Sequence, residues 1–280
     1  MAKEELTSTR REPVFPANAL TERVIAEKQG AIGWITFNNP ARRNAMSVDM
    51  WEAIPKVLDR FEADAQVRVV VLCGAGDKAF VSGADISQFE AQRSGAEAVQ
   101  RYEDICEGAQ VRLQESDKPV IAMIQGFCLG AGINIALASD LRIAADDARF
   151  GIPAAKMGIG YRVSSTKNLV DTVGAANARE VLLTARQFSA EEAKAMGLVH
   201  RVTPAAELEA LVAEYCSAIS TNAPLTMRTA KRIIRELLKS PAGFDAESCT
   251  ALVKQCFESA DYVEGRRAFM EKRRPVFDGK

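Results

Sequence analysis

The chain of 280 residues has a single histidine, His200, and its six cysteines form no C-x-x-C pair. A histidine-rich metal site is therefore excluded, and neither a zinc site nor a disulfide framework is indicated. No G-x-S-x-G elbow occurs, so a Ser-His-Asp triad is not indicated either. We expect buried or free thiols in a reducing compartment, and a structural role for His200 in its short apolar stretch.

Charge of one sign is also lacking, because 36 Lys and Arg face 37 Asp and Glu. This balance argues against nucleic acid or an anionic membrane as the main partner. The longest uncharged run, 119–139, is interrupted by Gln125, Asn134 and three glycines. It predicts a buried strand, a glycine-rich bend and a helix start rather than a membrane span. Since residues 1–18 hold no apolar run long enough for a signal peptide, we expect a cytoplasmic protein.

Short apolar segments alternate with helical patterns along the first part of the chain, which predicts an α/β core with parallel pairing. The expected strands are 23–27, 32–37, 67–73, 120–124 and 141–144. The expected helices are 48–62 and 96–114, followed after Ser164 by an almost wholly helical pattern that includes 190–196 and 225–238. We predict a disordered or loosely attached arm (1–18), a core (19–205) and a helical oligomerisation region (206–280).

Two glycine-containing bends follow predicted strands, at 71–89 and 125–134. Small residues there leave backbone N–H groups free to point at a ligand. Each bend taken singly is commonplace. The second bend resembles the G-x-G-x-x-G motif of dinucleotide-binding proteins, but Ile135 occupies the position of the third glycine.

Five segments in order make the sequence resemble the crotonase superfamily, the enoyl-CoA hydratase/isomerase family. They are N-N-P-A-R-R-N-A-M-S (38–47), A-F-V-S-G-A-D-I (79–86), K-P-V-I-A-M-I-Q-G-F-C-L-G-A-G (118–132), S-D-L-R-I-A-A-D-D-A-R-F-G-I-P (139–153) and E-G-R-R-A-F-M-E-K-R-R-P (264–275). The resemblance implies a crotonase (ClpP-like) spiral of β-β-α turns with a C-terminal helical trimerisation region. It also implies acyl-CoA substrates, no separate cofactor because coenzyme A is part of the substrate, and a homotrimer or dimer of trimers.

The resemblance also implies site residues. The backbone N–H groups of Ala84 and Ala131 would hold the negative oxygen of a thioester enolate. The residues implied to meet coenzyme A are Arg42, Arg43, Ala84, Asp85, Ile86, Phe269 and Lys272, the last two from a neighbouring subunit. From the residues alone, the favoured interpretation of Lys272 and its basic neighbours is a solvated helix face balanced by Glu264 and Glu271.

The sequence departs from the family at the two hydratase glutamates, whose places fall on Asn134 and Ala154. Neither residue can exchange a proton near neutral pH, so ordinary hydration should be severely weakened. Asn134 is either an amide that holds a loop or water, or a hydrogen-bond donor to substrate.

The segment 154–165 resembles methylmalonyl-CoA decarboxylases, in which a tyrosine at the place of Tyr161 contacts the substrate carboxylate. That subgroup has a histidine where Ala84 stands, and Tyr161 could also simply pack with Met157. Decarboxylation needs no glutamate base, because loss of CO2 itself generates the carbanion. We therefore favour decarboxylation or another enolate reaction over hydration, and keep as the alternative a catalytically silent CoA-thioester binder or assembly subunit.

Overall fold

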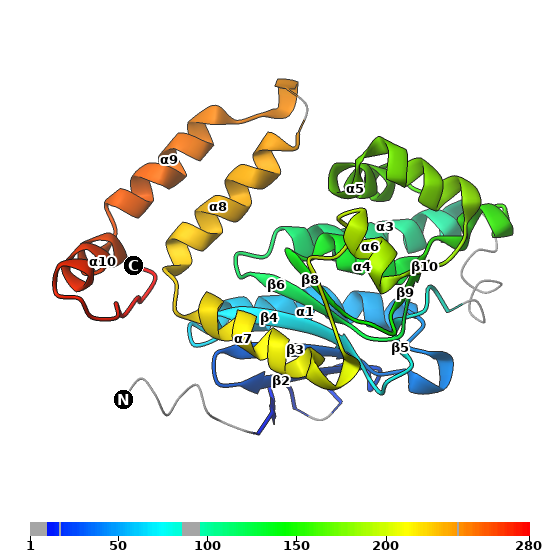
Figure 1. Cartoon of the computed structure of the whole chain (residues 1–280), viewed down its shortest axis with the longest axis horizontal. Coiled ribbons are helices and arrows are strands. Elements are labelled where there is room, and N and C mark those ends of the chain that lie inside the picture. Colours follow the sequence, from blue (N-terminus) through cyan, green and yellow to red (C-terminus); the bar gives the residue numbers. More distant parts are fainter. Residues whose placement is uncertain (1–9, 17, 86–95, 240) are drawn as a thin grey trace.

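The computed structural model describes residues 10–16, 18–85, 96–239 and 241–280. Its described helices include none that is both long and apolar enough to span a membrane. Across the described chain, strands form two sheets, and helices pack around them (Figure 1).

The larger sheet has seven strands in the order β1-β2-β3-β4-β6-β8-β11. Their bounds are Glu12–Pro13, Val24–Gln29, Ile32–Phe37, Val69–Gly74, Val120–Ile124, Leu141–Ala145 and Arg201–Thr203. β1, β2 and β3 pair antiparallel, whereas every pair from β3 to β11 is parallel. The buried strands are rich in β-branched residues, as parallel strands covered on both faces require.

The smaller sheet has four strands in the order β10-β9-β7-β5, with bounds Phe188–Ser189, Arg149–Gly151, Phe127–Leu129 and Ala79–Val81. Consecutive strands alternate between the two sheets: β4 is followed by β5, β6 by β7, and β8 by β9. A helix leads from β5 to β6 and another from β7 to β8. The chain therefore winds as repeated β-β-α turns, which confirms the predicted spiral.

Helices cover both faces of the larger sheet. The main core lies on the side of α1 (Val48–Ala63), α3 (Ala96–Gln114) and α4 (Ala131–Ala138). α5 (Val163–Thr184) bends at Gly174, whose φ of 75° is not helical, and α6 (Ala190–Ala195) starts with a capping box at Ser189. On the opposite face α7 (Leu208–Ser220) buries Leu208, Val212 and Cys216 against the sheet.

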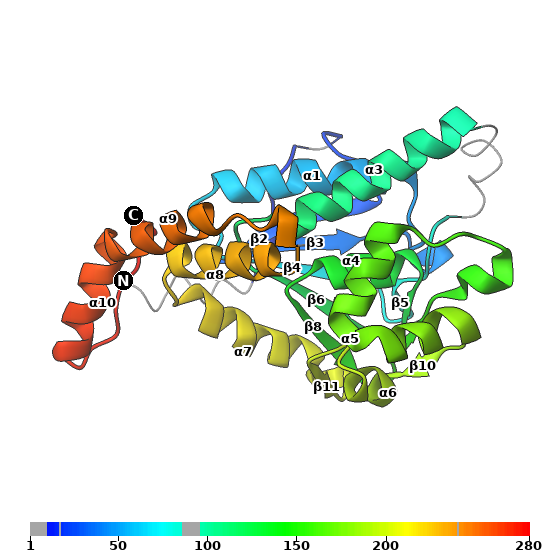
Figure 2. The same cartoon turned by 90° about the horizontal axis from the view of Figure 1, so that it is seen from above.

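Three helices continue beyond the sheets. α8 (Pro224–Leu237) and α9 (Ala246–Phe257) pack side by side, and α10 (Ala260–Met270) lies at the end of the molecule far from the smaller sheet (Figure 2). The C-terminal residues fold back on α10, because Asp261 accepts hydrogen bonds from the backbone of Asp278 and Gly279. Since α7 packs against the larger sheet, the helices that extend beyond the sheets begin at α8.

The long predicted elements are confirmed within a few residues, whereas two expectations need correction. Residues 10–16 of the predicted arm are attached rather than disordered: β1 pairs with β2, and Arg11 stacks on Trp34 at 3.6 Å. The stretch after Ser164 contains strands β10 and β11 besides its helices. All six cysteines are free thiols.

Candidate active site

Three parallel strands of the smaller sheet end at the same cavity. β5 runs into Ser82–Ala84, β7 into Gly130–Ala131, and β9 into Ile152–Ala154, and all three segments line the cavity. Its volume is about 180 Å³. The carboxyl ends of parallel strands meet at one edge of a sheet, which is where α/β proteins commonly bind ligands.

The first predicted donor, Ala84, is held by a bridge to Met46, shortly after the turn at Arg42 and Arg43. Met46 donates its N–H to the carbonyl of Gly83, and Asp85 donates its N–H to the carbonyl of Met46. In this bridge the N–H of Ala84 faces away from Met46. It donates no backbone hydrogen bond to another described residue.

The second predicted donor, Ala131, is the first residue of α4, so its N–H has no acceptor within the helix. No described backbone carbonyl outside the helix accepts from it. The preceding Gly130 has a φ of 50°, and a Cβ added there would lie 3.8 Å from the Cα of Gly83. The two bends are thus in direct contact.

α4 can approach β5 this closely because Gly132 has no side chain. A Cβ added there would lie 2.3 Å from the carbonyl oxygen of Val81, closer than real atoms allow. The glycine therefore fixes the start of α4 against the end of β5. This contact brings Ala131 and Ala84 to the wall of the same cavity.

Asn134 and Tyr161 form a pair in the cavity wall. The Tyr161 hydroxyl donates a hydrogen bond to Oδ1 of Asn134, which is only 7% exposed. Burial raises the pKa of Tyr161 above its ordinary value, so the phenol stays protonated near neutral pH. Tyr161 thus has a specific polar partner in addition to its apolar neighbours.

The cavity also contains residues that sequence reasoning missed. Glu103 and Tyr102 come from α3, Trp51 from α1, and Arg162 caps the start of α5. Arg162 Nε lies 3.1 Å from Oε2 of Glu103. The sequence gives only a weak indication that Glu103 lies in a site. It is a charged residue beside the apolar stripe of α3, three positions before the buried Cys106.

The residues predicted to meet coenzyme A fall into two groups. Arg42 lies next to the bend at Ala84 and donates to Oδ1 of Asp85 at 2.8 Å, while Arg43 stacks on Phe127 at 4.9 Å. Phe269 and Lys272 lie on and just after α10, far from the cavity within one chain. Ile86 lies outside the described residues.

Comparisons with known proteins agree with this fold. Residues 27–280 match the family model described as enoyl-CoA hydratase/isomerase. A short-chain-enoyl-CoA hydratase of Clostridium acetobutylicum is 35% identical over 90% of this chain and 95% of its own length. A carnitinyl-CoA dehydratase of Escherichia coli O157:H7 is 32% identical over 93% and 100%.

Among solved structures, an enoyl-CoA hydratase/carnithine racemase from Magnetospirillum magneticum superposes with a TM-score of 0.88. It is 34% identical and covers 93% of this chain and 97% of its own. An enoyl-CoA hydratase from Bacillus anthracis gives a TM-score of 0.84 at 31% identity, over 92% and 100%. The family model, the relatives and the superposed structures all cover nine tenths of the chain or more, and the chain belongs to the enoyl-CoA hydratase/isomerase family.

Proposed function

We propose that the chain is an enzyme that binds an acyl-CoA thioester in the cavity and stabilises its enolate with the N–H groups of Ala84 and Ala131. The observation that carries this proposal is the contact between the two glycine-containing bends. Within them, the N–H groups of Ala84 and Ala131 donate to no backbone carbonyl of another described residue. A developing oxyanion is best stabilised by donors already oriented toward it. The N–H of Ala131 adds the favourable field at the start of α4.

We favour decarboxylation or another enolate reaction over hydration of a double bond. The support is that Asn134 and Ala154 both line the cavity. The sequence resemblance assigns to these two positions the glutamates of the family's hydratases. An amide and a methyl group cannot act as acid and base at neutral pH. Tyr161, held by Asn134, is proposed to orient the group that reacts. The reaction requires no separate cofactor, because coenzyme A enters as part of the substrate.

Recognition of the coenzyme A phosphates is proposed for Arg42 and Arg43, which lie beside the bend at Ala84. Phe269 and Lys272 would complete this site from a neighbouring subunit, in a homotrimer or a dimer of trimers. This assignment is supported by their position at the far end of the chain and by the 83% exposure of Phe269. An aromatic side chain so exposed is available for a contact between subunits.

The reaction is tested by incubating the protein with a panel of CoA esters and reading the products by mass spectrometry. Loss of CO2 from methylmalonyl-CoA or ethylmalonyl-CoA would support the preferred reaction. Efficient hydration of crotonyl-CoA would refute the preference while leaving the thioester site intact. If no acyl-CoA is converted although one binds, the silent binder is the correct reading.

The oxyanion donors are tested by Ala131→Pro, which deletes one N–H at a helix position where proline is otherwise tolerated. We expect a fall in kcat of about 10²- to 10³-fold. Ala246→Pro is the matched control, because Ala246 is the first residue of α9, is exposed and lies outside the cavity. Equal turnover of the two variants would remove Ala131 from the proposed site.

A further inference from the structure

The cavity holds one carboxylate that the proposed function does not use. Among the described residues that line it, Glu103 is the only Asp or Glu. Its side chain is 30% exposed. Tyr102 and Cys106 flank it on α3 and line the same cavity, and both are buried. The acidic side chain therefore lies between two buried residues of the cavity wall.

Arg162 fixes where this carboxylate lies. Besides the 3.1 Å contact between Arg162 Nε and Oε2, its Nη1 donates to the backbone carbonyl of Glu103 at 3.4 Å. The guanidinium thus contacts both the side chain and the main chain of one residue. Arg162 directly follows Tyr161, so the start of α5 positions the carboxylate and the Tyr161–Asn134 pair together.

We propose that Glu103 exchanges a proton with the carbon next to the thioester carbonyl, and that Arg162 is its positioning residue. In one direction the C–H bond breaks and its electron pair forms the carbon–carbon double bond of the enolate. The carbonyl π pair moves onto oxygen, and the proton bonds to a carboxylate oxygen of Glu103. The reverse step returns the proton to carbon, so atoms and charge balance without a further reactant.

Other polar side chains of the cavity serve this step less well. Asn134 is an amide, and Tyr161 is a phenol that is protonated near neutral pH and whose pKa burial raises further. Glu103 lies on α3, on a different element from the strand ends that carry the donors of Ala84 and Ala131. The base and the oxyanion donors can therefore contact different atoms of one bound thioester. This inference rests on the proposed thioester site.

The test is hydrogen–deuterium exchange at the α-carbon of butyryl-CoA in D2O, followed by mass spectrometry. We expect the wild-type protein to exchange these hydrogens and Glu103→Gln to lose at least about 10²-fold in rate. Glu107→Gln is the matched control, since Glu107 is one turn further along α3 and exposed. Arg162→Gln should lower the exchange rate while leaving the Kd for butyryl-CoA unchanged, and Arg162→Lys should restore part of that rate.

Undiminished exchange by Glu103→Gln would overturn the assignment, as would absence of exchange in the wild-type protein. Neither result would remove the thioester site, because conversion of the CoA panel and its sensitivity to Ala131→Pro report on that site separately. Conversely, exchange that depends on Glu103 would hold even if no malonyl-type ester were decarboxylated. Titration calorimetry with butyryl-CoA tests whether Glu103→Gln still folds and binds.

Discussion

His200 has a structural position away from the cavity. Its Nδ1 accepts a hydrogen bond from the backbone N–H of Arg142 at 3.1 Å, just before β11 joins the larger sheet. The buried Arg142 guanidinium in turn donates to the backbone carbonyls of Leu198 and Ser139. Although His200 is exposed as a whole residue, partial loss of water around its imidazole lowers its pKa, and the positive charge of Arg142 adds to this effect. The neutral imidazole is therefore the form that the fold stabilises.

The prediction is that His200 titrates below its ordinary value of 6.5 in the folded protein. Because the sequence has one histidine, a single imidazole resonance in an NMR pH titration reports it. The unfolded chain binds the proton at higher pH than the folded chain does. The free energy of unfolding should therefore fall as the pH drops from about 6.5 through the folded pKa. A measured pKa at or above 6.5 would contradict the environment described for His200.

The sequence predicts those cavity residues that lie within the family's motifs. It does not predict the residues that reach the cavity only through tertiary packing. Ala84, Ala131, Asn134 and Tyr161 were found through the resemblance, and all four line one cavity. Glu103 was missed because nothing in α3 distinguishes it from a solvent-exposed glutamate. Its position in the cavity follows from how α3 packs against α4 and the start of α5. Such long-range packing leaves no local pattern.

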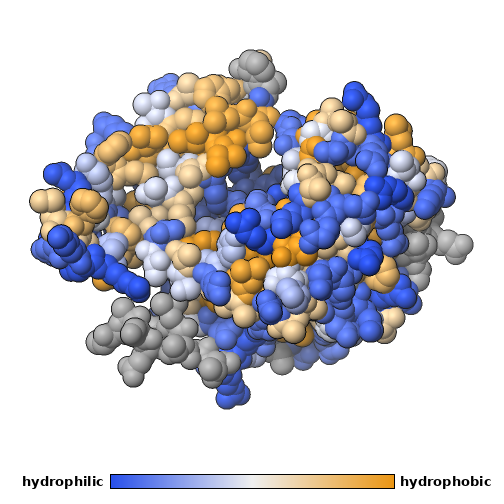
Figure 3. All heavy atoms as spheres, viewed as in Figure 1, coloured by the Kyte–Doolittle hydropathy of each residue, from blue (hydrophilic) through white to orange (hydrophobic). Residues whose placement is uncertain are grey.

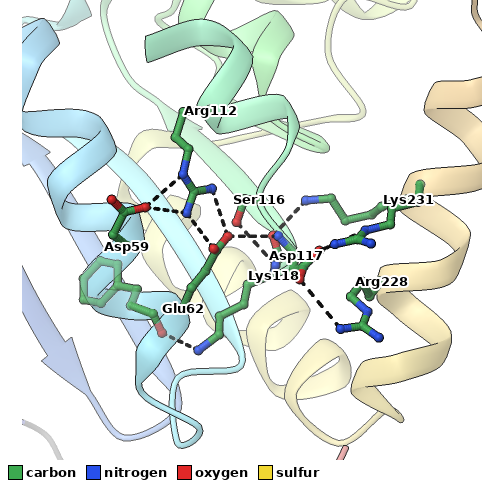
Figure 4. A network of polar contacts seen from close by, with 10 residues as sticks. Asp59, Glu62, Arg112, Ser116, Asp117, Lys118, Arg228 and Lys231 are labelled. Atoms are coloured by element: carbon green, nitrogen blue, oxygen red, sulfur yellow. Dashed lines mark hydrogen bonds and ion pairs between the residues drawn. The ribbon is translucent and has the colours of Figure 1, made fainter. Parts of the chain in front are cut away.

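Between elements, a network of charged side chains joins α1, α3 and α8 at the start of β6 (Figure 4). Arg112 of α3 donates to both carboxylate oxygens of Glu62 in α1. The backbone N–H of Asp117 also donates to Glu62 at 3.0 Å, and Asp117 accepts from Arg232 of α8 at 2.6 Å. Glu62 therefore links the core helices to the segment that anchors α8.

Glu62→Gln should reduce the free energy of unfolding by about 1–3 kcal/mol near neutral pH, because a charged acceptor of several hydrogen bonds is lost. Burial opposes ionisation of Glu62, but the hydrogen bonds from Arg112 and Asp117 outweigh it. The pKa of Glu62 is therefore below 4.5. Because its pKa is lower in the folded chain, the ionised carboxylate stabilises the fold at pH values above its ordinary pKa. This contribution is lost as the pH falls through the folded pKa. Denaturant unfolding of both proteins from about pH 7 to about pH 3 measures the difference.

The matched control for Glu62 is Asp59→Asn. Asp59 bonds the same Arg112 at 2.8 Å but is 68% exposed, so its removal should cost no more than about 1 kcal/mol. Equal costs for the two variants would show that burial of the ion pair does not matter here. A Glu62→Gln cost that persists undiminished at about pH 3 would contradict the lowered pKa.

Strands were predicted from the sequence where the apolar segment is five or six residues long, and were missed where it is only three residues long. β2, β3, β4, β6 and β8 each have five or six residues rich in apolar side chains, and their positions were predicted. β5, β7 and β9 have three residues each, too few to show alternation. They exist because each follows a long strand around the spiral. The smaller sheet was therefore not predicted from the sequence, although the glycine-containing bends that follow β5 and β7 were.

At the scale of the whole molecule, the helices beyond the sheets leave apolar side chains uncovered. Hydrophobic residues gather over α8 and α9 on one face (Figure 3). Leu237 and Phe257 are 65% and 61% exposed, and Val263 and Met270 on α10 are exposed as well. Contiguous exposed apolar surface of this kind is typical of a contact with another chain. This supports the predicted assembly, which would cover the surface with copies of the same region.

The uncovered apolar surface of α8–α10 predicts an assembly of several chains in solution. In sedimentation velocity at micromolar concentration, we expect the wild-type protein to sediment as a trimer or a dimer of trimers. Leu237→Glu combined with Phe257→Glu should shift it toward the monomer, because two charges would have to be buried in the contact. Leu183→Glu is the control, since Leu183 is 77% exposed on α5, away from α8–α10. If the wild-type chain sediments as a monomer, Phe269 and Lys272 cannot reach a neighbour's coenzyme A, and their assignment fails with the assembly.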